Sequence, residues 1–199
     1  MINNTLVPYV IERTNEGERS YDLYSRLLQD RIVFIQGEVN DASMNVAIGQ
    51  LLFLNNQDNT KPIFMYINSP GGSCTSGLAL IDTMRLIKAP VYTICVGMAA
   101  SMGAAILSCG EKGHRYVLPN STVMVHQSSG GEQGNIQDAR VGMKYWEQLN
   151  DRLAKIIADN CGITVKKYLN STIRDCWMFP EDAIKFGIVD KVLDSEDEV

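Results

Sequence analysis

The segment 97–103 (GMAASMG) places Ser101 between an apolar, strand-like run and a run of small, helix-forming residues. A strand–turn–helix junction of this kind exposes backbone N–H groups at the start of the helix. A serine held there can face a substrate while neighbouring amides receive an oxyanion. The pattern is close to the G-x-S-x-G nucleophile elbow without matching it. Small residues also let a buried turn and helix pack closely, so both interpretations stay open on this motif alone.

His126 is a second residue that could take part in such chemistry. It follows the apolar residues 123–125 and precedes a glycine-bearing loop. A histidine at the end of a strand can face a cleft and act as a general base near neutral pH. A structural role is the alternative. The only other histidine, His114, lies in a polar turn and is predicted to be a solvated surface residue.

The acidic partner of a serine–histidine pair cannot be chosen from composition, because the chain has 23 Asp and Glu residues. Asp175 is attractive because residues 173–179 are largely apolar, which predicts a half-buried carboxylate. Arg174 could instead pair with Asp175 at the surface.

The segment 68–73 (NSPGGS) follows another apolar run. Two adjacent glycines let a backbone approach a ligand closely with its N–H groups facing it. The alternative is an ordinary turn between a strand and a helix. No Gly-Lys-Ser/Thr motif occurs here or elsewhere, so we expect no ATP hydrolysis by this chain.

Predicted strands and helices alternate along the chain and must position these residues. Apolar runs predict strands at 31–35, 63–67, 91–96, 116–118 and 122–125, with a last strand beginning at 188–189. Helices are predicted after an N-cap at Asp41, after the SPGG segment that ends the second strand, from about residue 100, over 136–159, and from Pro180 to Gly187. This alternation predicts an α/β domain with a largely parallel sheet.

Composition narrows the class of protein. A chain of 199 residues suits one domain, and a net charge of −5 without a dense Lys/Arg block argues against nucleic-acid or anionic-membrane binding.

Residues 89–110 carry no charge, but Gly97 interrupts them, which favours a strand, a turn and a helix over a membrane span. The five cysteines show no CxxC spacing and are predicted to be free thiols, with no metal site. The N-terminus lacks the pattern of a secretory signal.

Together these segments resemble the proteolytic subunits of the Clp protease family (ClpP). The resemblance covers essentially the whole chain, from residues 6–8 and 17–28 to 186–190. Its most specific parts are 66–73, 97–103, 118–119 with 124–127, and the pair Arg174-Asp175. The family's order and spacing are kept throughout.

The resemblance implies a serine endopeptidase, a hydrolase that needs no cofactor. Ser101 would be the nucleophile, His126 the general base and acid, and Asp175 the residue that orients the imidazole. The family's remaining site positions are the oxyanion-hole amides of Gly72 and Met102, and the residues that bind substrate as an added strand, Gly71, Ser129, Gly130 and Gly131.

The implied fold is crotonase-like: α/β, with repeated β-β-α-type units, a mostly parallel sheet and a long protruding handle helix. Residues 1–20 would form an N-terminal axial arm or loop, 21–193 a single peptidase domain with a handle region at about 128–160, and 194–199 an acidic tail.

The resemblance also implies a homo-oligomer of two stacked heptameric rings, a tetradecamer that encloses a chamber for protein degradation and quality control. An AAA+ unfoldase of the ClpX, ClpA or ClpC type would consume the ATP and thread in unfolded proteins. The expected location is the cytoplasm of a bacterium or an organelle of bacterial origin. The implied ATPase-docking residues, for which core packing is the alternative, are Tyr66, Ile94, Tyr116, Leu118 and Leu193.

The implied ring–ring contact involves Gln133 and Arg174, and three positions nearby depart from the family pattern. Ser128 stands where a proline is usual, and Glu132 where an apolar residue is common. Ile173 replaces an acidic residue that in relatives joins the arginine in salt links between rings.

Two other functions are alternatives to the peptidase. A catalytically silent or regulatory ring subunit is disfavoured by the complete set of Ser101, His126 and Asp175. A crotonase-type acyl-CoA enzyme would leave the serine and histidine motifs unexplained.

Overall fold

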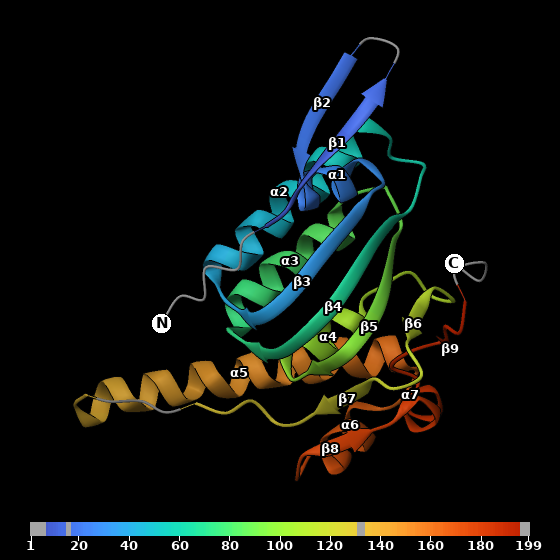
Figure 1. The fold of residues 1–199 in the computed structure, drawn as a ribbon. Coiled ribbons are helices and arrows are strands. Elements are labelled where there is room, and N and C mark those ends of the chain that lie inside the picture. Colours follow the sequence, from blue (N-terminus) through green and yellow to red (C-terminus); the bar gives the residue numbers. More distant parts are fainter. Residues whose placement is uncertain (1–6, 15–16, 131–133, 196–199) are drawn as a thin grey trace.

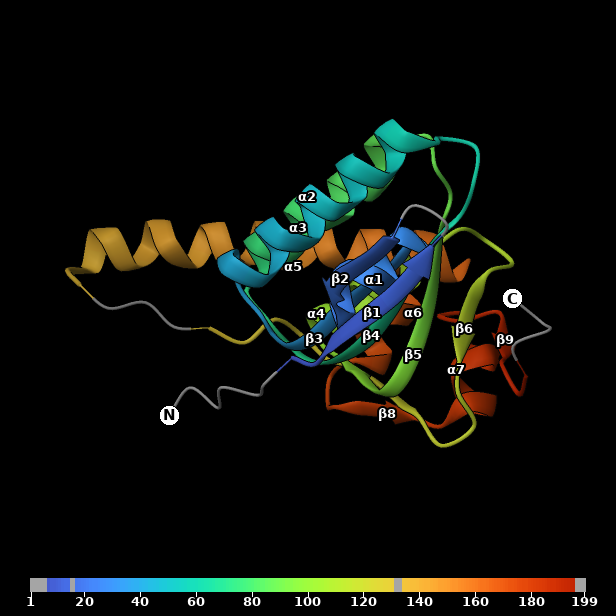
Figure 2. The ribbon, with the colours of Figure 1, turned by 45° about the horizontal axis from the view of Figure 1, so that its top comes forward.

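The structure is a computed structural model that describes residues 7–14, 17–130 and 134–195. Figures 1 and 2 show the arrangement of its elements. The strands are β1 (Tyr9–Thr14), β2 (Gly17–Asp22), β3 (Ile32–Val39), β4 (Ile63–Gly72), β5 (Val91–Ala100), β6 (Arg115–Val117), β7 (Thr122–Val125), β8 (Cys176–Met178) and β9 (Lys191–Val192). The helices are α1 (Leu23–Gln29), α2 (Asp41–Gln57), α3 (Cys74–Leu86), α4 (Met102–Ser108), α5 (Ile136–Cys161), α6 (Val165–Ser171) and α7 (Pro180–Phe186).

The main sheet is largely parallel, as predicted. Its strand order is β3-β4-β5-β6-β9, and every pair along this path is parallel. The long strand β5 pairs with β6 along its first half and with β7 along its second half, also in parallel. Among the described strands, only β8, which was not predicted, joins this sheet in the antiparallel direction, against β7.

The two faces of the sheet bury different sets of side chains. Ile63, Met65 and Ile67 of β4 point into the main core, where α2, α3, α4 and α5 cover the sheet (Figure 1). Phe64 and Tyr66, the intervening residues, belong to a second apolar cluster on the opposite face. This alternation follows from the two-residue period of a strand.

The strand β4 continues through residues 69–72, so the prediction that the SPGG segment ends it is wrong. The registers against β3 and β5 shift at this point, where Gln36 pairs with Asn68 but Glu38 with Gly71. A bulge lets a strand carry a proline, which cannot donate to the ladder. The predicted cap of α2 is also one residue off. Asn40 is the N-cap, because its side chain accepts from the Ser43 N–H at 3.0 Å in a capping box.

The helix α5 agrees with the prediction of one long helix over 136–159. Its C-terminal half buries Leu149, Leu153 and Ile157 in the core. Its N-terminal half extends beyond the sheet and the other helices in both views (Figures 1 and 2), and apolar side chains there, such as Ile136 and Val141, are exposed.

The described part of the N-terminal arm is a β-hairpin, which the sequence did not predict. The strands β1 and β2 pair antiparallel along their whole length. The hairpin is joined to α1 by an ion pair between Arg26 Nε and Glu12 Oε1 at 2.6 Å. Tyr9 and Ile11 on β1 are exposed.

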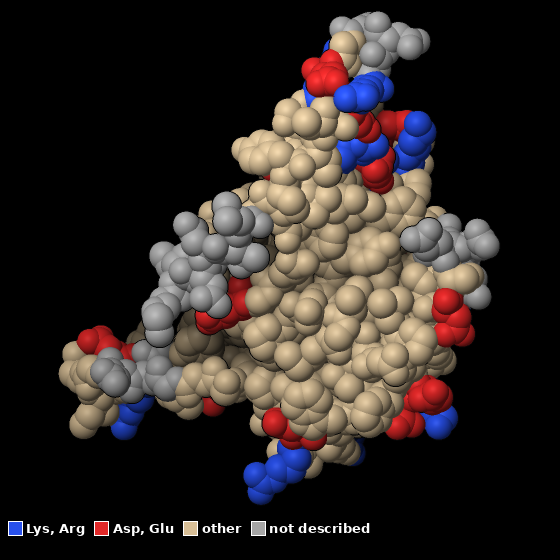
Figure 3. Space-filling view, in the orientation of Figure 1, with Lys and Arg blue, Asp and Glu red and all other residues tan. Residues whose placement is uncertain are grey.

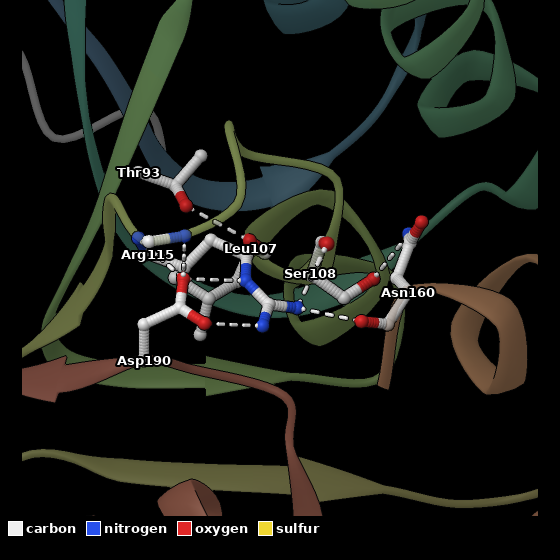
Figure 4. A network of polar contacts seen from close by, with 7 residues as sticks. Thr93, Leu107, Ser108, Arg115, Asn160 and Asp190 are labelled. Atoms are coloured by element: carbon white, nitrogen blue, oxygen red, sulfur yellow. Dashed lines mark hydrogen bonds and ion pairs between the residues drawn. The ribbon is translucent and has the colours of Figure 1, made fainter. Parts of the chain in front are cut away.

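A buried ion pair fastens the C-terminal segment to the sheet (Figure 4). Arg115 on β6 donates from Nη2 to Asp190 Oδ1 at 2.6 Å and from Nε to Oδ2 at 2.9 Å. Its Nη1 donates to the carbonyl of Asn160, at the end of α5. The Arg115 side chain is 4% exposed, so this network replaces the water that the guanidinium loses on folding. In the part of the chain that the structure describes, no helix has the length and apolar character needed to cross a membrane.

Candidate active site

Ser101 occupies a strained junction between β5 and α4. Its φ is +53°, a value that residues with a side chain seldom adopt. It is the N-cap of α4, yet its side chain makes no capping hydrogen bond, so the hydroxyl is left to face outward. Its N–H donates to the Met124 carbonyl at 2.9 Å. The predicted strand and helix are present, but β5 continues through Gly97 to Ala100, so the prediction that Gly97 interrupts the strand with a turn is wrong. The turn lies at Ser101 and has the geometry of a nucleophile elbow.

Two glycines of β4 come close to this junction. A Cβ on Gly71 would lie 2.6 Å from the Ser101 Cβ and 2.9 Å from the Met102 nitrogen. A Cβ on Gly72 would lie 2.3 Å from the Val39 carbonyl oxygen. Both glycines have positive φ. Only glycine fits at these two positions, and Gly71 thereby comes close to Ser101 and Met102. Gly72 and Met102 both line the cavity beside the serine.

His126 lies beside Ser101 because of strand register. The parallel pair β5–β7 aligns Ala100 with Met124, and each strand ends shortly afterwards. The His126 Nε2 and the Ser101 Oγ are 2.8 Å apart, a hydrogen-bond distance. The hydroxyl donates to Nε2 when the ring proton is on Nδ1. These two residues, predicted from separate motifs, are brought together.

Asp175 precedes β8, and the antiparallel pairing of β8 with β7 brings it to the other side of the imidazole. Its Oδ1 is 3.6 Å from the His126 Nδ1, longer than a hydrogen bond. The prediction of a half-buried carboxylate is wrong, since its side chain is 59% exposed. The reason is that the apolar neighbours Ile173 and Trp177 face outward too. No ion pair joins Arg174, also exposed, to Asp175 or to any other described residue.

A cavity of about 60 Å³ opens beside the serine. Ser101, His126, Gly72 and Met102 line it, and so does Ser129 of the predicted substrate-binding segment. Gly130 packs against Trp146 of α5, where a Cβ would lie 3.4 Å from the ring. The predicted residues Gly131 and Gln133 lie outside the described residues.

The predicted docking residues divide into two groups. Tyr66, Leu118 and Leu193 line a groove of about 530 Å³ on the face of the sheet that the main-core helices leave uncovered. Ile94 and Tyr116 are fully buried beneath that groove, so core packing is part of their role. In Figure 3 the centre of this face has no charged side chains, which gather on the hairpin and along the rim.

His114 is not the solvated residue that its polar turn predicted. Its ring stacks on Tyr92 with centroids 3.9 Å apart and an interplanar angle of 2°. Its Nδ1 lies 3.0 Å from the Tyr116 hydroxyl. The turn folds back onto the second apolar cluster, and it lies on the opposite face of the sheet from Ser101.

All five cysteines are free, as predicted. Burial raises the pKa of each thiol, to about 12 for Cys95 and Cys161. In Cys74, which lines the cavity beside Ser101, burial also raises the pKa, while a hydrogen bond with Ser128 opposes the rise. Among the described residues, no three His, Cys, Asp or Glu side chains gather in a way that could hold a metal ion.

Several residues that line this cavity were not predicted as part of a site: Cys74, Ala105, Asn150, Leu153, Ala154, Ile157 and Tyr168. Asn150 lies on α5, a helix that was predicted correctly. It is a polar residue on the side of the helix that faces the protein, and such a residue is a sequence signal for a site. Tyr168 lies on α6, which was not predicted, and nothing in its neighbourhood pointed to the site.

A model of the Clp protease family matches residues 15–196. The chain belongs to the Clp protease family. The match covers nearly the whole sequence, including every residue of the site described above. Membership supports a ClpP-type peptidase, which is a hydrolase, and it agrees with the mixed α/β architecture and mostly parallel sheet seen here.

Proposed function

We propose that this chain is a serine endopeptidase that cleaves unfolded proteins through an acyl-enzyme formed on Ser101. The observation that carries the proposal is the 2.8 Å contact between Ser101 Oγ and His126 Nε2, at the mouth of a cavity and beside the first turn of α4. A serine hydroxyl is a poor nucleophile until a base takes its proton, and His126 is placed to do so.

In the proposed acylation step, Ser101 Oγ attacks the scissile carbonyl carbon as His126 Nε2 takes the hydroxyl proton. The N–H groups of Gly72 and Met102 stabilise the charge that develops on the carbonyl oxygen. The C–N bond then breaks as His126 passes the proton to the leaving amine. Water repeats the sequence on the acyl-enzyme and restores Ser101. Protons and electron pairs move only among substrate, water and these groups, so the scheme needs no cofactor.

Asp175 is assigned the orientation of the imidazole and the stabilisation of its charged form. The distance of 3.6 Å to Nδ1 requires a small closure before a hydrogen bond forms. Catalytic hydrogen bonds are often long without substrate and shorten in the reacting complex. The extended backbone of Gly71 on one side, and of Ser129 and Gly130 on the other, is suited to hold a peptide as an added strand.

Two exposed apolar surfaces support assembly with other proteins. The protruding half of α5 displays Ile136, Val141 and Met143 to solvent, which favours its burial in a contact between stacked rings. The apolar groove at Tyr66, Leu118 and Leu193 suits an apolar loop of an AAA+ unfoldase, which would use the ATP. In such an assembly the active sites would face an enclosed chamber.

A peptidase assay tests this proposal. The purified, assembled protein should cleave a short fluorogenic peptide, and Ser101→Ala should lower the rate by at least about 10³-fold. Ser20→Ala, which removes an exposed hydroxyl from β2, is the control and should cleave at the wild-type rate. Cleavage that survives in Ser101→Ala would remove Ser101 from the mechanism.

A further inference from the structure

The cavity beside Ser101 combines an apolar wall with polar, uncharged groups. Ala105, Leu153 and Ile157 form the apolar wall, and Asn150 and Tyr168 contribute an amide and a hydroxyl. None of the described lining residues is Asp, Glu, Lys or Arg. The cavity therefore offers hydrogen bonds without offering a counter-charge.

Tyr168 is the first of the two polar groups. The residue is only 4% exposed, and its hydroxyl makes no hydrogen bond with any described residue. Burial raises the pKa of Tyr168, with Cys161 and Cys176 adding to the effect, so the hydroxyl stays protonated and can donate. None of the described residues has a buried side-chain N or O atom without a partner, so solvent reaches this hydroxyl through the cavity. A ligand that accepts its hydrogen bond would take the place of that solvent.

Asn150 is the second polar group, and its orientation is fixed by the substrate-binding segment. The N–H of Ser128, two residues after His126, donates to Asn150 Oδ1 at 3.1 Å. In the reverse orientation the Asn150 Nδ2 would face the Ser128 N–H, and both groups are donors. The Nδ2 group is therefore left over, and it has no partner among the described residues.

The volume of the cavity limits the size of what it binds. About 60 Å³ is room for roughly four to six water-sized groups, at about 10–15 Å³ each. Side chains of Asn, Gln, Leu and Met are of this size, whereas those of Phe and Trp are larger. A charged side chain would be buried there without a counter-charge, which is costly.

We infer that this cavity receives the side chain that precedes the scissile bond and prefers an uncharged amide, glutamine or asparagine. The amide oxygen would accept hydrogen bonds from the Tyr168 hydroxyl and the Asn150 Nδ2. This inference rests on the proposed peptidase function and assigns Tyr168 and Asn150 as specificity-determining residues. Ser128 acts through Asn150 and is a positioning residue.

Near-isosteric substrates test the preference. Four fluorogenic peptides differ only in the residue before the cleaved bond, as a Gln/Met pair and an Asn/Leu pair. The assembled wild-type protein should show the higher kcat/KM for the amide in each pair. The Gln/Met ratio should fall by about tenfold in Tyr168→Phe, which removes one oxygen, and similarly in Asn150→Leu. Tyr9→Phe removes an exposed hydroxyl of the hairpin and should keep the wild-type ratio.

A binding measurement separates this inference from the peptidase proposal. Peptides that end in Gln or Met are titrated by calorimetry onto assembled Ser101→Ala protein, which does not depend on turnover. The Gln peptide should bind more tightly, and adding Tyr168→Phe or Asn150→Leu should remove the difference. Equal binding of the two peptides, or a ratio unchanged by both substitutions, would overturn the amide preference. Failure of the assembled wild-type protein to cleave any of the four peptides would instead overturn the peptidase proposal.

Discussion

The His126 Nε2 lies 2.8 Å from the Ser101 Oγ, although the two residues come from different strands. The alignment of Ala100 with Met124 in the β5–β7 pair brings the strand ends together. The positive φ of Ser101 then turns its side chain out of the sheet, towards the imidazole. Strain of this kind persists only where the surrounding structure holds it. Here the close approach of Gly71 and the start of α4 hold it.

Asp175→Asn should lower kcat by about 10³-fold, because an amide cannot stabilise the charged imidazole as a carboxylate does. The measurement is steady-state cleavage of a fluorogenic peptide by the assembled variant. Asp182→Asn, a change at another exposed acid, is the control. An unaltered kcat in Asp175→Asn would show that the carboxylate has no part in the reaction.

Gly71→Ala should lower the free energy of unfolding by about 2–4 kcal/mol, from an unfavourable φ of +95° and a clash with Ser101. It should also abolish most peptidase activity, because Ser101 must shift to relieve the clash. Denaturant unfolding and peptide cleavage measure the two effects. Gly49→Ala is the matched control, since Gly49 is an exposed helical glycine with open space around it, and alanine should be neutral or stabilising there. Wild-type stability in Gly71→Ala would contradict the tight packing.

Asp190→Asn should lower the free energy of unfolding at pH 7 by about 3–5 kcal/mol, because it leaves the buried Arg115 guanidinium without its counter-charge. Burial by itself would raise the pKa of Asp190, but the hydrogen bonds and charge of Arg115 outweigh it and lower the pKa. The carboxylate therefore stabilises the fold above its unfolded-state pKa of about 4. This contribution is lost as the pH falls through the lower folded-state pKa.

The gap in the free energy of unfolding between wild type and Asp190→Asn, measured across pH 2.5–7, should thus narrow below about pH 4, by at most about 1.4 kcal/mol per pH unit. A gap that stays constant over the whole range would contradict the role of the ion pair.

Leu118→Ser should weaken docking of an unfoldase at the apolar groove. With a ClpX-type ATPase and ATP, degradation of an unfolded protein should fall by about tenfold relative to peptide cleavage by the same preparation. Val165→Ser, an apolar-to-polar change at an exposed position outside the groove, is the control. An unchanged ratio of protein to peptide degradation would place docking elsewhere.

The parts of the fold that could be predicted are those whose signal is local. Each of these signals lies in contiguous sequence: the apolar runs of β3 to β7, the helical spacing of apolar residues along α5, and Pro180 and Gly187 at the ends of α7. The continuation of β4 past Pro70 could not be predicted, because it depends on a bulge against two neighbouring strands.

The candidate site divides in the same way. Ser101 and His126 each sit next to a strand end with its own motif, so the sequence points to both. The exposure of Asp175 could not be predicted, because it depends on the pairing of β8 with β7. This pairing is antiparallel and puts β8 at an edge of the sheet. Asn150 and Tyr168 reach the cavity from helices that meet the His126 loop only through tertiary packing.

The most direct test of the central claim is the site of covalent modification by a serine-reactive fluorophosphonate, identified by peptide mass spectrometry of the assembled protein. We expect one stoichiometric adduct, on Ser101, that is absent in Ser101→Ala. We also expect His126→Ala to slow labelling by about 10³-fold, since the base that activates the hydroxyl is removed. An adduct on a different serine, or an unmodified Ser101 in protein that cleaves peptides, would contradict the assignment of Ser101 as the nucleophile.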